Sequence, residues 1–94
     1  PTFDAALTTA AKALAQTRRP VGLVMWAGRH AWVMTGFEST GNPRRDEDAR
    51  VTRVRVMDPL YPHGSRWGRS PAPNSLVSRK ALKRQSSSSA PTRR

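Results

Sequence analysis

The chain has 94 residues, no cysteine and a formal net charge of +11 at pH 7. This length permits one small domain, and the lack of cysteine excludes disulfides, thiolate metal sites and a thiol nucleophile supplied by these residues. No secretory signal pattern is present, and no apolar run approaches the roughly 18 residues of a membrane helix. Because the chain begins with Pro1 instead of methionine, we expect that it was processed or is a piece of a longer reading frame.

The positive charge is concentrated towards the C-terminal end. Residues 1–60 carry nine Lys/Arg and six Asp/Glu, whereas residues 61–94 carry eight Lys/Arg and no acid. Residues 1–64 hold nearly all the core-forming side chains, and residues 65–94 are rich in Pro, Ser and Arg. We therefore expect a folded part over 1–64 and a largely disordered basic tail over 65–94, with only a weak amphipathic turn at 75–84.

The first predicted element is a helix over residues 2–16. Apolar side chains such as Leu7 and Leu14 recur there at helical spacing and form a narrow stripe. Thr2 is a suitable N-cap, and Pro20 prevents the helix from continuing. A helix of this length is marginal alone, so it needs a sheet to pack on.

Three strands are predicted after this helix. Residues 21–27 form an apolar run, residues 28–29 have the Gly-X form of a two-residue hairpin turn, and residues 30–38 and 51–57 favour two further strands. The fold class is therefore α+β, with one N-terminal helix packed on a small antiparallel sheet of about three strands. We expect the helix to cover an apolar face made by Val24, Trp26, Val33 and Val54, and we expect Trp26 and Trp32 to be core residues.

His30 and Asp58 stand at the ends of two predicted strands. His30 begins the strand at 30–38, and Asp58 directly follows the strand at 51–57. If these strands pair antiparallel, the start of the first lies beside the end of the second, so both side chains reach the same edge of the sheet. A carboxylate that holds an imidazole in one tautomer makes a base-and-orienter pair, as in nucleophilic triads.

Three short stretches carry a family resemblance: residues 19–26 (RPVGLVMW), 28–37 (GRHAWVMTGF) and 54–59 (VRVMDP). In this order and spacing they resemble the C-terminal half of a papain-like cysteine peptidase, most closely the bacteriocin-processing (double-glycine) peptidase-like branch. The resemblance covers roughly residues 5–62. It implies half of a papain-like fold and a peptide substrate.

By this resemblance, His30 takes the place of the general base and Asp58 that of its orienter, while Gly36 and Pro59 match structural positions. The family's nucleophilic cysteine and oxyanion-hole glutamine precede the first helix and are not among these 94 residues. We therefore expect the chain to be inactive alone, and to need completion by an upstream half before it acts on a peptide substrate.

Two other functions remain open. The basic tail, with residues 79–84 (RKALKR), could contact the phosphates of a nucleic acid. Deletion of 65–94 should then abolish binding and leave the folded part unaffected. The chain could instead be a noncatalytic papain-fold module that binds a partner, which is favoured if Ser, Ala or Gly stands at the nucleophile position.

We expect no cofactor and no metal. His30, Asp58 and His63 are possible zinc ligands, but they lack the fixed spacing of a zinc site. The residues that follow Asp58, including Tyr61 and His63, are expected to form an ordinary surface loop.

Overall fold

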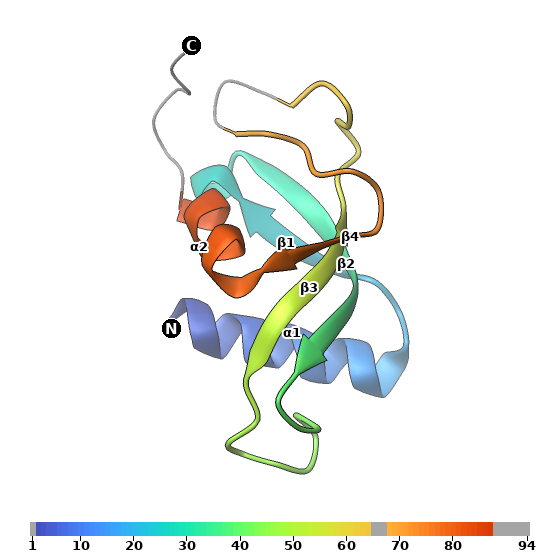
Figure 1. Ribbon diagram of the computed structural model, residues 1–94, viewed down its shortest axis with the longest axis vertical. Coiled ribbons are helices and arrows are strands. Elements are labelled where there is room, and N and C mark those ends of the chain that lie inside the picture. Colours follow the sequence, from blue (N-terminus) through green and yellow to red (C-terminus); the bar gives the residue numbers. More distant parts are fainter. Residues whose placement is uncertain (1, 65–67, 88–94) are drawn as a thin grey trace.

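A four-stranded antiparallel sheet with two helices on one face forms the fold (Figure 1). The computed structural model describes residues 2–64 and 68–87. The elements in chain order are α1 (Phe3–Thr17), β1 (Val21–Met25), the 3-10 turn η1 (Trp26–Gly28), β2 (His30–Ser39), β3 (Val51–Met57), β4 (Ser75–Ser78) and α2 (Arg79–Ser87). The α+β class and the antiparallel sheet agree with the sequence analysis, but the fold has one more strand and one more helix than we expected.

Helix α1 forms as predicted and packs through its apolar stripe. The hydroxyl oxygen of Thr2 accepts a hydrogen bond from the Ala5 amide at 3.1 Å and caps the first turn. At the other end, Arg18 adopts a left-handed conformation and donates its N–H to the Leu14 carbonyl. The side chains of this helix that reach the core are Leu7, Ala10, Ala11 and Leu14.

The strands follow one another in sheet order as they do in the chain, from β1 to β4, and every neighbouring pair is antiparallel. In the first hairpin, Met25 pairs with His30. The turn between them is longer than the predicted Gly28-Arg29 pair. Trp26, Ala27 and Gly28 have φ values of 53°, 53° and 91°, so the chain turns through three successive left-handed residues. Strand β1 therefore ends at Met25 instead of Ala27.

The covered face of the sheet differs from our expectation. Trp26 and Val54 are buried as predicted, at 2% and 0% exposure, but Val24 is 66% exposed and Val33 is only partly buried. Val24 pairs with Ala31, on the face opposite to Met25 and His30. Trp26 directly follows Met25, and strand alternation would place it on the exposed face with Val24. It is buried instead because it lies in the turn, where this alternation no longer applies.

The inner face carries most of the core. It is lined by Met25, Trp32, Met34, Val54 and Val56, each at most 2% exposed. Both helices contribute side chains to this same core. The opposite face of the sheet has no helix of the described chain upon it, so the fold has two layers (Figure 1).

The folded part of the chain extends beyond residue 64, where we placed its boundary. Residues 75–87, for which we expected no more than a weak amphipathic turn at 75–84 within a largely disordered tail, form β4 and α2. Val77 pairs with Val54 of β3, and Leu82 is 1% exposed in the core. The serine before the helix caps it, because the Ser78 hydroxyl accepts from the Ala81 amide at 3.1 Å. Deletion of 65–94 would therefore remove part of the core, contrary to our expectation.

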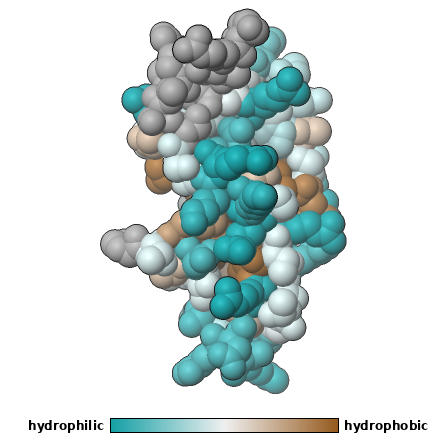
Figure 2. Space-filling model, turned by 60° about the vertical axis from the view of Figure 1, so that its left-hand side comes forward, coloured by the Kyte–Doolittle hydropathy of each residue, from teal (hydrophilic) through white to brown (hydrophobic). Residues whose placement is uncertain are grey.

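The rest of the expected tail, residues 65–67 and 88–94, lies outside the described residues. Within the described chain, no helix is long and apolar enough to cross a membrane. Figure 2 shows hydrophilic side chains over most of one face of the molecule, with small hydrophobic patches between them.

Candidate active site

His30 and Asp58 meet at one end of the two central strands of the sheet, β2 and β3. His30 is the first residue of β2, and Asp58 directly follows Met57, the last residue of β3. Nε2 of His30 lies 2.6 Å from Oδ1 of Asp58. The Asp58 side chain is fully buried, while 17% of the His30 side chain is exposed. The antiparallel pairing predicted from sequence therefore brings the two side chains together, with the carboxylate inside and the imidazole towards solvent.

The charged form of Asp58 is favoured by its surroundings. Burial alone would raise the pKa of Asp58, but hydrogen bonds from His30 and from the Leu60 amide outweigh it and hold this pKa below its ordinary value. The Leu60 amide donates to the same Oδ1 atom at 2.8 Å. The Ser70 hydroxyl also lowers the pKa of Asp58. Asp58 is therefore a buried anion fixed beside the imidazole.

The hydrogen bond assigns different roles to the two ring nitrogens of His30. An ionised carboxylate can only accept, so Nε2 of His30 carries the proton and donates it. In the neutral ring the lone pair then lies on Nδ1. This nitrogen is the one that can take a proton from a nucleophile, while Asp58 holds the ring in that tautomer.

Trp26 forms a floor beneath the imidazole. The indole of Trp26 and the ring of His30 are stacked, with centroids 4.6 Å apart and planes inclined by 18°. Trp32 meets Trp26 edge-on, with centroids 6.4 Å apart at 82°. Both tryptophans are 2% exposed, so the core assignment holds for both. The sequence analysis missed the contact of Trp26 with His30, because that contact depends on the left-handed turn.

Gln85 and Gly68 both lie at the Nε1 edge of the Trp26 indole. The indole Nε1 donates a hydrogen bond to Oε1 of Gln85, in α2, at 2.8 Å. A methyl group on Gly68 would collide with both of these atoms, so the backbone of the loop after β3 lies directly against the Trp26–Gln85 bond. Neither residue was a candidate from sequence, because both lie in the segment assigned to the tail.

Gly36, Pro59 and His63 are the other residues that the sequence analysis named. Gly36 pairs with Arg55 next to a β-bulge, and a methyl group there would be in ordinary contact with the Arg55 side chain. Pro59 lies in the turn that carries Asp58, where the backbone carbonyl of Asp58 accepts a hydrogen bond from the Tyr61 amide. His63 is exposed in the following loop. No three His, Asp or Glu side chains gather to hold a metal ion anywhere in residues 2–64 and 68–87.

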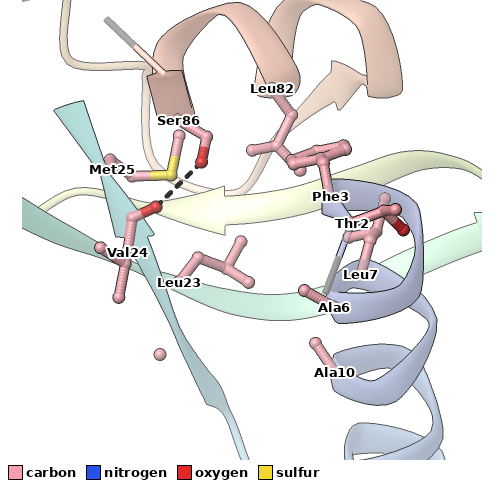
Figure 3. A pocket seen from close by; sticks show the side chains of 11 residues that line it. Thr2, Phe3, Ala6, Leu7, Ala10, Leu23, Val24, Met25, Leu82 and Ser86 are labelled. Atoms are coloured by element: carbon pink, nitrogen blue, oxygen red, sulfur yellow. Dashed lines mark hydrogen bonds between the residues drawn. The ribbon is translucent and has the colours of Figure 1, made fainter. Parts of the chain in front are cut away.

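An apolar groove of about 380 Å³ lies between α1, β1 and α2 (Figure 3). Phe3 and Leu7 approach it from α1 and Leu82 from α2, and the Ser86 hydroxyl donates to the Val24 carbonyl across one end at 3.2 Å. Neither His30 nor Asp58 lines it. The groove is therefore separate from the pair, and the sequence analysis missed it because α2 was not predicted.

No family model, curated protein or solved structure matches this chain. The candidate active site consequently depends on its own geometry. It consists of a buried carboxylate, an imidazole with one nitrogen bonded to it, and an aromatic floor.

Proposed function

We propose that this chain is the His/Asp-bearing half of a papain-like cysteine peptidase domain of the bacteriocin-processing (double-glycine) type. His30 is its general base and Asp58 its orienter. The observation that carries the proposal is the 2.6 Å hydrogen bond between His30 Nε2 and the buried carboxylate of Asp58. Such a bond leaves Nδ1 as the basic nitrogen, which is what a base beside a nucleophile requires.

The proposed reaction needs a thiol from outside these 94 residues, because they contain no cysteine. His30 Nδ1 takes the thiol proton, and the resulting thiolate attacks the peptide carbonyl carbon. The imidazolium then gives its proton to the leaving amine as the peptide bond breaks, and water later releases the acyl group from sulfur. Asp58 stabilises the imidazolium and keeps the ring oriented throughout.

The test uses the product of the complete reading frame that encodes this chain. We expect a cysteine upstream of Phe3, closely preceded by glutamine, and cleavage of a peptide that contains a double-glycine site. Alkylation of the thiol should stop cleavage, and His30→Ala should lower kcat/KM by about 10³-fold or more. His63→Ala is the matched control, since His63 is the other histidine and is exposed in the loop after β3.

Cleavage that survives either thiol alkylation or His30→Ala would overturn the proposal. A reading frame with Ser, Ala or Gly at the nucleophile position would instead support a noncatalytic module that binds a partner through the same fold.

A further inference from the structure

We infer that Trp26 and Gln85 are positioning residues for His30, so that the C-terminal helix α2 takes part in orienting the base. The catalytic meaning of this inference depends on the proposed function, whereas the positioning itself is a property of these 94 residues. Two contacts link α2 to the first residue of β2: Gln85 accepts a hydrogen bond from Trp26, and Trp26 is stacked on His30.

The first step is the contact of Trp26 with the imidazole. Asp58 holds one edge of the ring through Nε2, but a single hydrogen bond still allows the ring to tilt about that bond. The nearly parallel indole, 4.6 Å away, covers one ring face and restricts this tilt.

The second step is how the Trp26 ring is itself held. Its backbone has φ of 53°, a conformation that side chains other than glycine seldom adopt, and this turn directs the indole beneath β2. The Nε1–H group is bonded to Gln85, and the edge-on contact with Trp32 supports the ring from the core. The backbone of Gly68 lies against this same Nε1–Gln85 bond and leaves no room for a side chain there. The indole therefore has little freedom unless one of these supports is removed.

Gln85 is distinct from the residues that attach α2 to the core. Leu82 is the buried apolar anchor of this helix, and the Ser86 hydroxyl bonds to the Val24 carbonyl at 3.2 Å. Gln85, by contrast, bonds to the ring that is stacked on His30. Substitution of Gln85 and of Ser86 each removes one hydrogen bond between α2 and the first hairpin, so the two positions make a matched pair.

The experiment records the ¹⁵N and ¹H NMR signals of the His30 ring in the 94-residue chain at pH 8. This measurement needs neither a nucleophile nor a substrate. In the unsubstituted chain we expect one Nε2–H tautomer and ring protons shifted upfield by the indole face. Gln85→Leu should weaken the Nε2–H signal, because a freer ring loosens its bond to Asp58, and reduce the upfield shift. Gln85→Glu, which keeps the acceptor oxygen, should restore both signals, and Ser86→Ala should leave both unchanged.

The inference is wrong if Gln85→Leu leaves the His30 signals as they are, or if Ser86→Ala changes them equally. Should Gln85→Leu fail to fold, Trp26→Phe gives the same information, since phenylalanine keeps a ring but loses the bond to Gln85. An unchanged Nε2–H signal in that variant would also overturn the inference. Altered NMR signals, together with a full-length product that lacks thiol-dependent cleavage, would support the positioning and refute the peptidase proposal.

Discussion

His30 and Asp58 are 28 residues apart in the chain and are joined by one 2.6 Å hydrogen bond across the ends of two neighbouring strands. β3 ends at Met57, opposite Val33, so Asp58 follows it alongside the first residues of β2, close to His30. The Asp58 side chain is fully buried, and 17% of the His30 side chain is exposed. The following predictions start from this arrangement and from its supports.

Acid should destabilise the protein through Asp58. Its pKa is lower in the folded state than in the unfolded chain, so its stabilising contribution is complete above the unfolded value near 3.9 and is lost as the pH falls through the folded value. We expect the urea midpoint to fall steeply below about pH 4. The Asp58→Asn variant should lose this part of the acid dependence, and Asp48→Asn, at an exposed loop position, should keep it. Equal acid dependence of the two variants would contradict the prediction.

Helix α2 should be part of the cooperative fold. Leu82→Ala removes a side chain that is 1% exposed, so we expect a loss of about 2–5 kcal/mol in the free energy of unfolding. Lys83→Ala, at the exposed neighbouring position, should change it by less than about 0.5 kcal/mol. Chemical denaturation followed by far-UV circular dichroism measures both. A Leu82→Ala variant as stable as the Lys83→Ala variant would show that α2 is not part of the core.

The turn before His30 should respond in opposite directions to two substitutions. Ala27 has φ of 53°, so Ala27→Gly relieves backbone strain and should raise the free energy of unfolding by up to about 1 kcal/mol. Gly28 has φ of 91° with no atom near an added methyl group, so Gly28→Ala should lower it by about 1 kcal/mol through the backbone alone. Thermal unfolding of the two variants measures both changes. The same sign of change in both would show that this turn is not left-handed in solution.

Gly68 should tolerate no side chain. A methyl group there would meet Oε1 of Gln85 and Nε1 of Trp26, so Gly68→Ala should cost about 1–3 kcal/mol and displace the indole. Gly22→Ala is the control, because no atom lies within 4 Å of its added methyl group and its backbone is an ordinary strand. Near-UV circular dichroism reports the tryptophan environment and unfolding reports the stability. A Gly68→Ala variant with the spectrum and stability of Gly22→Ala would contradict this packing.

Several features of the fold could be predicted from the sequence because their signals are local. The spacing of Leu7 and Leu14, with Thr2 before and Pro20 after, was enough for α1. Apolar runs separated by turn residues predicted β1, β2 and β3. Antiparallel pairing of the last two then predicted that His30 and Asp58 lie near each other, and the structure places the two side chains in contact. Their catalytic role remains a prediction.

Tertiary structure decided the rest, because the deciding contacts join residues far apart in the chain. The composition of residues 65–94 favours disorder, yet one buried leucine, Leu82, and one strand pairing, Val54 with Val77, attach residues 75–87 to the core. Trp26 reaches His30 only through a left-handed turn, which local propensity disfavours and surrounding contacts stabilise. Gln85 meets Trp26 across 59 residues, a contact that periodicity cannot predict and that exists only once α2 has packed.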